Sequence, residues 1–327
     1  MPDLSTTYMG LGLANPFIVS SSSLTSDLDR LKSAEDAGAG AVVLKSLFEE
    51  QIIADANRLD DHGMDCFFPE ISDFVRGNTN WSGPDAYLQL IREAKSALSI
   101  PVIGSVNCVF PGWWASYAAE MEKAGADAVE LNISPVPGDI EKSATEIENG
   151  IIEIVRSVRQ KTSLPIAVKL GNNHSSMFQL AGLLSDMGAN ALVLFNRFYR
   201  FDIDLEKLEL THGPKFSHPD EISEGLRWTA LLSGRTELDL AATTGIHDEA
   251  AAIKMILAGA RAVQVCSILY LNGMQHIGRM ITGMNSWMEK HGFSSLDDFR
   301  GRLSQQASDE PEKYQRLQFV RMLVGID

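Results

Sequence analysis

The sequence has few cysteines and no long apolar run, and each shortage excludes a class of protein. Its 327 residues include three cysteines, Cys66, Cys108 and Cys266, which lie far apart and form no CxxC pair. A disulfide scaffold, a zinc ribbon or an iron–sulfur cluster within this chain is therefore not expected. No apolar run approaches the roughly 20 residues that span a bilayer, and the first residues do not resemble a signal peptide. We expect a cytoplasmic protein with no membrane partner.

Positive charge is also scarce. Lysine and arginine number 28 against 43 aspartates and glutamates, which gives a net charge of −15. Such a chain repels nucleic-acid phosphates, so we expect a small-molecule substrate and no nucleic-acid partner. P-loop, HExxH and GxGxxG motifs are missing as well, and we predict no metal site.

Four segments repeat one pattern, in which a small residue or Met, a glycine and an alanine precede a hydrophobic run. They are residues 37–44, 124–131, 187–194 and 258–265. The glycine tolerates the left-handed backbone at a helix end, and the run is typical of a buried strand. A repeated helix–strand unit indicates a parallel sheet.

A second set of strands lies between the repeats. Three begin at a proline, in residues 16–20, 101–105 and 165–169, and a fourth is expected at 238–241. Amphipathic stretches fill the gaps, at about 26–37, 84–98, 113–124, 145–161, 175–187, 226–234, 248–258 and 272–290. Eight alternating units in one chain predict a single-domain α/β protein, a closed (β/α)8 TIM barrel rather than an open sheet.

Three segments exceed the minimal barrel. Insertions at about 47–82 and 197–225 follow the second and sixth strands, and residues 292–327 form a polar tail that we predict to be helical. Both insertions leave from the carboxyl ends of strands, so they are expected to cover the ligand site, although plain surface loops are the alternative.

Polar residues collect where the predicted strands end. Lys45 and Lys169 each follow an apolar run, and a lysine there is costly unless it meets an anion; the alternative is that both reach solvent. Asn132 and Asn196 end two further strands and suit a planar heterocycle, or they cap turns. In barrels, ligands bind at these strand ends.

The ends of the last two strands suggest a phosphate site. Thr243, Thr244 and Gly245 follow the seventh strand, and Cys266 and Ser267 follow the eighth. Phosphate in such barrels binds at these two loops, where hydroxyls and close backbone N–H groups hold it. The alternative is an ordinary turn before a capped helix.

These motifs, in this order, resemble those of the dihydroorotate dehydrogenases, which are FMN-dependent (β/α)8 barrels. The resemblance covers nearly the whole chain and rests on ANPF with Ser20, Ser21 and Ser22, on VLKS at 43–46, ELNIS at 130–134, AVKL at 167–170, Asn196, TGI at 244–246 and CS at 266–267. It implies that a base removes a proton from C5 of the substrate while a hydride passes from C6 to flavin N5.

The resemblance also implies roles for the residues at the strand ends. Lys169 would lie near flavin N1 and O2, where a cation stabilises the reduced flavin. Lys45 would face the flavin and the substrate carboxylate, and Asn132 and Asn196 would bind the substrate. The implied FMN-binding set is Ser20, Ser21, Lys45, Ser46, Asn132, Lys169, Phe195, Ser223, Thr243, Thr244, Gly245, Cys266 and Ser267.

Three departures from the family pattern affect the substrate half of the site. The loop at 132–138 is two residues shorter and has no cysteine, so Ser134, with Lys45, is the catalytic candidate; a serine base needs a water or a partner to relay the proton. The family's substrate motif has no counterpart near residues 77–83. Ser223-Glu224-Gly225 and Thr244-Gly245 stand where the family has glycine-rich loops. We expect an FMN oxidoreductase acting on dihydroorotate or a related small carboxylated heterocycle.

Two other functions stay open on the sequence. A dihydrouridine-synthase-like flavoprotein would need a basic RNA-binding surface, and a phosphate-binding barrel without redox chemistry would bind no flavin. Within the resembling family, soluble members are commonly dimers, so a homodimer is expected. The electron acceptor, fumarate or an iron–sulfur partner subunit, stays open.

Overall fold

The computed structural model describes residues 1–48, 83–108, 114–136, 138–198, 200–315, 320 and 322–324. Most of the first predicted insertion, including residues 77–82, lies outside these residues. Its first two residues form β5 (Leu47–Phe48), which pairs with β6. Statements below concern the described residues.

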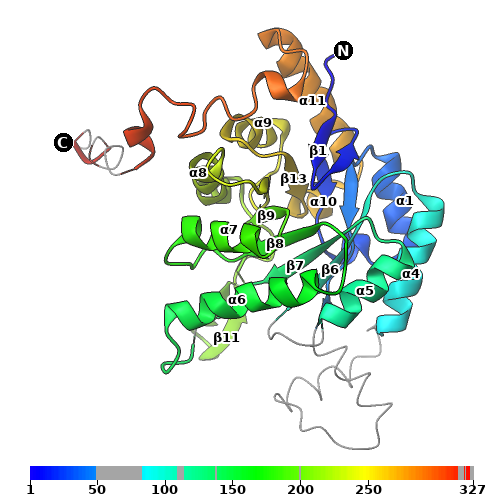
Figure 1. Ribbon diagram of the computed structural model, residues 1–327. Helices are drawn as coiled ribbons and strands as arrows, with labels where there is room; N and C mark the ends of the chain where they lie inside the picture. The colour runs from blue at the N-terminus through cyan, green and yellow to red at the C-terminus, as the bar shows by residue number, and fades with distance from the viewer. Residues whose placement is uncertain are drawn as a thin grey trace, which may run out of the picture.

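The described residues form a closed barrel of parallel strands (Figure 1). The barrel strands are β3 (Phe17–Val19), β4 (Ala41–Val43), β6 (Val102–Asn107), β7 (Ala128–Ile133), β8 (Ile166–Leu170), β9 (Ala191–Leu194), β12 (Asp239–Ala242) and β13 (Ala262–Val265). Closure comes from β4, in which Ala41 pairs with Ile18 on one side and Val42 pairs with Val102 on the other. The predicted (β/α)8 TIM barrel is confirmed.

The glycine repeat explains where half of these strands begin. Gly38, Gly125, Gly188 and Gly259 all have positive φ angles, between 93° and 120°, and in each case a strand begins three residues later. A residue with a side chain is strained at such angles, so glycine ends the helix and turns the chain into the barrel.

Helices cover the outside of the barrel. They are α1 (Leu28–Asp36), α4 (Pro84–Ala97), α5 (Trp114–Ala124), α6 (Ala144–Arg159), α7 (Met177–Asp186), α8 (Ile222–Leu232), α9 (Glu249–Ala258), α10 (Ser267–Asn272) and α11 (His276–His291). The helix predicted at 226–234 instead begins at Ile222, directly after the 3-10 turn Pro219–Glu221, so residues 223–225 are helical and form no loop. The helix predicted at 272–290 begins later, at His276, because Gly273 with a φ of 81° ends α10 and separates it from α11.

A hairpin closes the amino-terminal end of the barrel. It consists of β1 (Thr6–Tyr8) and β2 (Leu11–Leu13), paired antiparallel. Tyr8, Met9 and Leu13 are buried and pack with the inward-facing residues of the strands. The Met9 N–H donates to Asp239 Oδ2 at 2.7 Å, which ties the hairpin to β12. The interior is therefore a packed core, and the opposite end carries the ligand site.

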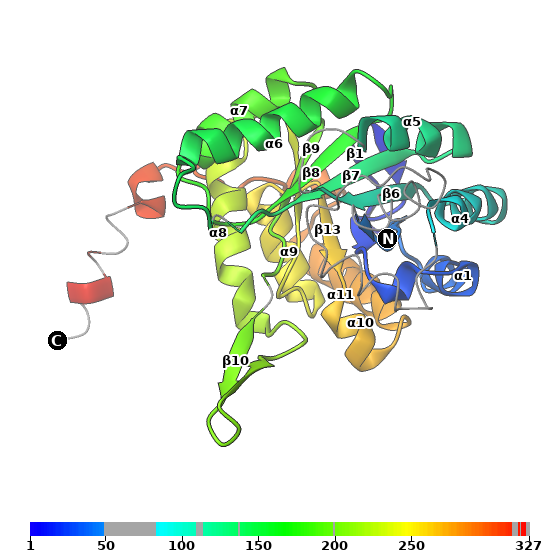
Figure 2. The ribbon, with the colours of Figure 1, turned by 90° about the horizontal axis from the view of Figure 1, so that it is seen from below.

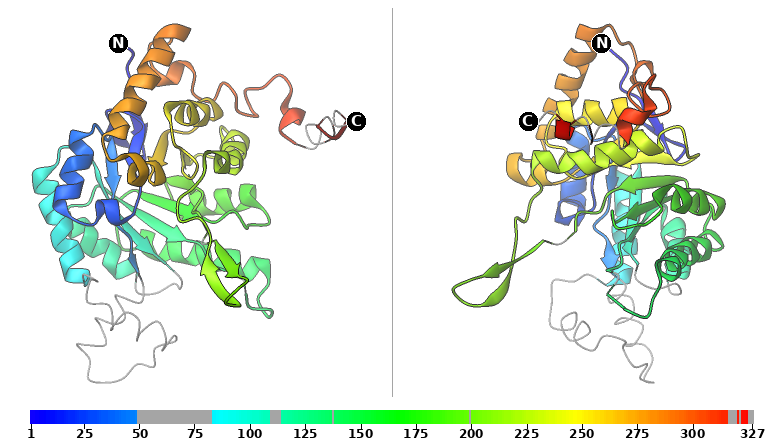
Figure 3. Two further views of the ribbon diagram at one scale, coloured as in Figure 1. Left: turned by 180° about the vertical axis from the view of Figure 1, so that it is seen from behind. Right: turned by 90° about the vertical axis from the view of Figure 1, so that its left-hand side faces the viewer.

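The second insertion contains a hairpin of its own. β10 (Phe201–Asp204) and β11 (Glu209–His212) pair antiparallel and project away from the barrel (Figures 2 and 3). The described part of the tail contains the 3-10 turns Leu296–Asp298 and Pro311–Tyr314. None of the helices in the described residues is long and apolar enough to cross a membrane.

Candidate functional site

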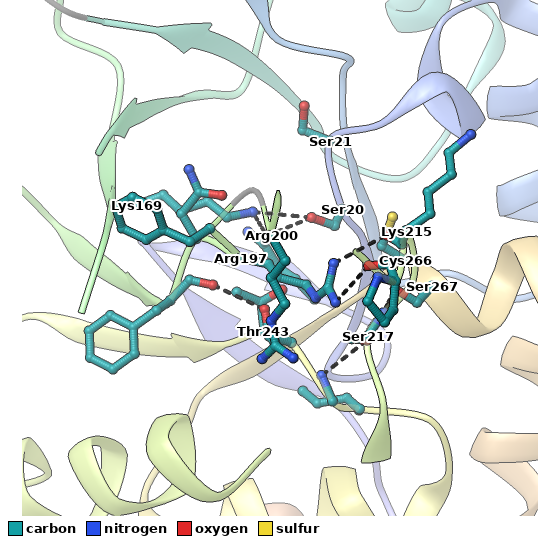
Figure 4. A pocket seen from close by; sticks show the side chains of 18 of the residues that line it. Ser20, Ser21, Lys169, Arg197, Arg200, Lys215, Ser217, Thr243, Cys266 and Ser267 are labelled. Atoms are coloured by element: carbon teal, nitrogen blue, oxygen red, sulfur yellow. Dashed lines mark hydrogen bonds between the residues drawn. The ribbon is translucent and has the colours of Figure 1, made fainter. Parts of the chain in front are cut away.

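A cavity of about 620 Å³ opens at the carboxyl ends of the strands (Figure 4). Ten of the predicted site residues line it, namely Ser20, Ser21, Lys169, Phe195, Asn196, Thr243, Thr244, Gly245, Cys266 and Ser267. This volume lies within the range of small-molecule and cofactor sites. The residues come from β3, β8, β9, β12 and β13 or the loops after them, so the barrel itself assembles the site.

Lys169 supplies a cation at the bottom of this cavity. It is the fourth residue of β8 and only 7% exposed. Its Nζ donates to Ser20 Oγ at 3.3 Å and to Gln264 Oε1 at 3.2 Å, and lies 3.8 Å from Glu130 Oε1. A buried ammonium held in this way is suited to an anionic or electron-rich ring edge.

The loop after β12 shapes another part of the wall. Thr244 and Gly245 have consecutive positive φ angles of 70° and 75°. A Cβ atom on Gly245 would lie 2.4 Å from the backbone nitrogen of Ile222, so only glycine fits. Ser217 N–H donates to Ser267 Oγ at 3.0 Å, which brings the insertion onto the loop after β13. Hydroxyls from three segments thus gather where the sequence predicts phosphate.

Arg197 and Glu221 hold the insertion over the cavity. Arg197 donates to Glu221 Oε2 at 2.9 Å and to the carbonyl oxygens of residues 214–216 at 3.0–3.2 Å. Arg200 lies 3.0 Å from the same carboxylate. Burial raises the pKa of Glu221, but hydrogen bonds from Arg197 and the His218 N–H and the charge of both arginines outweigh it and leave this pKa lowered. The carboxylate is therefore charged at neutral pH and fixes both guanidinium groups.

The two predicted asparagines meet at the cavity. Asn196 Nδ2 donates to Asn132 Oδ1 at 2.8 Å, across the ends of β7 and β9. Asn196 lines the cavity directly, and Asn132 reaches it through this bond. The pair leaves amide groups available for a ligand heterocycle.

The candidate base lies at the edge of this arrangement. A Cβ atom placed on Gly171, which follows β8, would lie 2.8 Å from Ser134 Oγ, 2.7 Å from Asn173 Oδ1 and 3.2 Å from the Phe198 ring. Ser134 therefore packs against the end of β8 rather than lining the cavity. Residue 137 of its loop lies outside the described part of the chain.

Three other predicted site residues do not line the cavity. The Lys45 side chain is exposed and does not line the cavity. Ser46 Oγ lies 2.9 Å from Ser21 Oγ and 2.8 Å from Ser105 Oγ, so it supports Ser21 from behind. Ser223 is exposed on α8 and lines a neighbouring hollow, because the predicted loop at this point is helical.

Burial shifts the pKa values of two side chains at the site, Cys266 and His247. Burial raises the pKa of the Cys266 thiol, against the opposing effects of Ser22 and the Lys169 charge, so Cys266 is a neutral donor rather than a thiolate. Burial also lowers the pKa of His247, whose Nε2 lies 3.0 Å from Ser217 Oγ. In the described residues, no cluster of His, Cys, Asp or Glu is suited to a metal ion.

Sequence reasoning assigned no role to several residues of the site. Ser217 and Arg197 lie in an insertion without periodic pattern, and their partners are 17 to 50 residues away. Glu130 and Gln264 gave a usable signal, since each is a polar residue in the interior of a buried, mostly apolar strand.

Comparison with known proteins agrees with this geometry. The family description "Dihydroorotate dehydrogenase" matches residues 3–288. A "dihydroorotate dehydrogenase B (NAD(+)), catalytic subunit" of Thermoplasma acidophilum is 30% identical, over 92% of this chain and 99% of the relative. A "putative dihydroorotate dehydrogenase A (fumarate)" of Aeropyrum pernix is 27% identical, over 92% and 97% respectively. The chain therefore belongs to the dihydroorotate dehydrogenase family, and it is an oxidoreductase of the CH–CH class.

Proposed function

We propose that this protein is an FMN-dependent dehydrogenase that oxidises a CH–CH bond of dihydroorotate or of a closely related carboxylated heterocycle. The observation that carries the proposal is the buried Lys169 ammonium in a cavity whose lining also offers serine and threonine hydroxyls. A planar ring with a phosphate arm, such as FMN, matches both the ammonium and the hydroxyls of this cavity. The family supports the same reaction over a dihydrouridine-synthase-like or a non-redox barrel.

Different residues of the chain would bind the phosphate, the flavin ring and the substrate. Thr243, Thr244, Gly245, Ser267 and Cys266 would hold the phosphate arm, and Lys169 would stabilise negative charge on the ring. Bound FMN would supply the hydride acceptor. Asn132 and Asn196 would orient the substrate through the amide groups left available beside their mutual hydrogen bond.

Two measurements on the purified protein test this proposal. We expect FMN fluorescence to be quenched in a titration, and the flavin band of the loaded protein to bleach when dihydroorotate is added without oxygen. A protein that takes up no FMN would overturn the redox proposal. Uptake of FMN without bleaching would instead exclude dihydroorotate and direct the search to related heterocycles.

Ser134 is the proposed base, acting through a water or a neighbouring group. Since general base catalysis contributes roughly 10²- to 10⁴-fold, Ser134→Ala should slow flavin reduction by about that factor while FMN affinity stays unchanged. The matched control is Ser175→Ala, because the Ser175 hydroxyl is exposed and bound to Glu148 at 3.1 Å. Equal reduction rates in both variants would remove Ser134 from this role.

We also propose a homodimer that buries the β10–β11 hairpin. Register places Ile203 opposite Leu210 and Phe201 opposite His212 on one face, and Asp202 and Asp204 on the other. Phe201, Ile203 and Leu210 are 66%, 53% and 77% exposed, an apolar surface of the kind that a second copy covers.

A lysine placed on either face of the hairpin tests which face the dimer buries. Leu210→Lys places an ammonium in the apolar face and should convert the dimer to a monomer in sedimentation velocity, while the reduction kinetics identify any coupled loss of activity. Thr211→Lys adds the same charge to the polar face and should leave the dimer intact. A monomeric wild-type protein, or dimers in both variants, would contradict this interface.

The electron acceptor and the setting belong to the same proposal. Relatives are named after NAD(+) and after fumarate, and some are named as catalytic subunits. A partner subunit that carries electrons to NAD(+) is therefore a candidate, as is fumarate itself. The cytoplasmic setting stays a prediction from the sequence.

A further inference from the structure

Two buried polar side chains next to Lys169 have no role in the function proposed above. Glu130 on β7 and Gln264 on β13 are each only 1% exposed, and both lie inside the barrel next to Lys169. A carboxylate at such a position is costly, so its presence needs a specific partner.

The three side chains form one connected cluster. Gln264 Oε1 accepts from Lys169 Nζ at 3.2 Å and from Ser20 Oγ at 3.1 Å, and its Nε2 donates to Glu130 Oε2. Glu130 Oε1 lies 3.8 Å from Lys169 Nζ and accepts no hydrogen bond within the described residues. Gln264 thus holds the ammonium through one end of its amide and the carboxylate through the other.

Only part of the cluster borders the cavity. Lys169 and Gln264 line the cavity, whereas Glu130 does not. The ammonium therefore borders the cavity and also contacts a carboxylate that does not line it. In a poorly solvated interior, opposite charges at this separation cancel much of each other's field.

We propose that Glu130 and Gln264 are positioning residues, which fix the Lys169 ammonium below the ligand ring and offset part of its charge. Glu130 acts through Lys169 and touches neither substrate nor cofactor. The inference rests on the proposed function, since the quantity it sets is the midpoint potential of bound FMN. Lys169 alone would favour the reduced, anionic flavin; the carboxylate behind it shifts that balance back toward the oxidised form.

The test is the midpoint potential of FMN bound to Glu130→Gln, measured against a reference dye. This substitution keeps the size and a hydrogen-bonding group and removes only the charge. We expect a more positive potential, equivalent to a gain of about tenfold in affinity for reduced over oxidised FMN, or some 30 mV for two electrons. Should the variant fail to fold, Glu130→Met fills a similar volume without a buried polar atom and carries the same expectation.

Tyr8→Phe is the matched control. The Tyr8 hydroxyl is buried in the same interior and makes no hydrogen bond to the described residues. Burial, and then the charges of Glu130 and Asp239, raise the pKa of Tyr8 well above its usual value, so its removal changes no charge. The potential should match wild type.

The outcomes separate the two proposals. A Glu130→Gln potential equal to or below that of wild type overturns the positioning role while the flavoenzyme stands. An equal shift in Tyr8→Phe overturns it too, because any change in packing would then have the same effect. A wild-type protein that takes up no FMN overturns both.

Discussion

Lys169→Met should slow the rate of flavin reduction by roughly 10²- to 10³-fold, which is the usual loss when one preorganised electrostatic group is removed. The reason is that Lys169 is the cation at the base of the cavity, held by Ser20 and Gln264. Anaerobic stopped-flow measurement of bleaching gives the rate directly. A variant that reduces its flavin at the wild-type rate would show that this ammonium does not face the reacting ring.

The same substitution should also destabilise the fold. Without Lys169, the buried Glu130 carboxylate loses its counter-charge, and breaking such a pair costs about 3–5 kcal/mol. Urea unfolding of Lys169→Met measures this loss. The double variant Lys169→Met/Glu130→Met should recover most of the stability and none of the rate, because only the electrostatic role is then missing.

Gly245→Ala should weaken FMN binding on the order of tenfold or more and lower the free energy of unfolding by at least about 2 kcal/mol. Gly245 has a φ of 75°, and an added Cβ would lie 2.4 Å from Ile222 N and 2.9 Å from the carbonyl carbon of Glu221. Neither atom can move without displacing the start of α8. A fluorescence titration and urea unfolding report the two effects.

A glycine in another setting gives the control. Gly182 lies in the exposed part of α7, and a Cβ there would meet no atom within 4 Å. Gly182→Ala should therefore leave FMN binding unchanged and stabilise the protein by roughly 0.5–1 kcal/mol, as alanine does within a helix. Similar losses of FMN affinity in both variants would contradict a specific role for Gly245.

The barrel was predictable because its signals are local. Each Gly-Ala pair ends a helix through its own backbone angle, and each apolar run that follows can only be buried, so neighbouring residues determine where the strands lie. The start of α8 was misplaced because Ser223-Glu224-Gly225 has weak helix propensity. The 3-10 turn at Pro219–Glu221, with Glu221 accepting from His218 N–H at 2.8 Å, sets the helix there instead.

The lining of the cavity was predictable only where it comes from strand ends. Lys169, Asn196 and the Thr243–Gly245 loop follow directly from strand ends. Ser217 reaches Ser267 only because Arg197 binds three carbonyl oxygens 17 to 19 residues away. Contacts of this kind leave no periodic pattern in a sequence.

The hairpin at the floor of the barrel sets a limit on when the protein can finish folding during synthesis. Residues 6–13 leave the ribosome well before their partners, because the Met9 N–H bonds to Asp239, and Thr6 Oγ1 accepts from Arg300 at 2.9 Å, a partner 294 residues later. The apolar side of this hairpin therefore stays exposed until the chain has been synthesised at least as far as Arg300. The nascent chain therefore carries this apolar surface without its folded partners while the whole barrel is being synthesised.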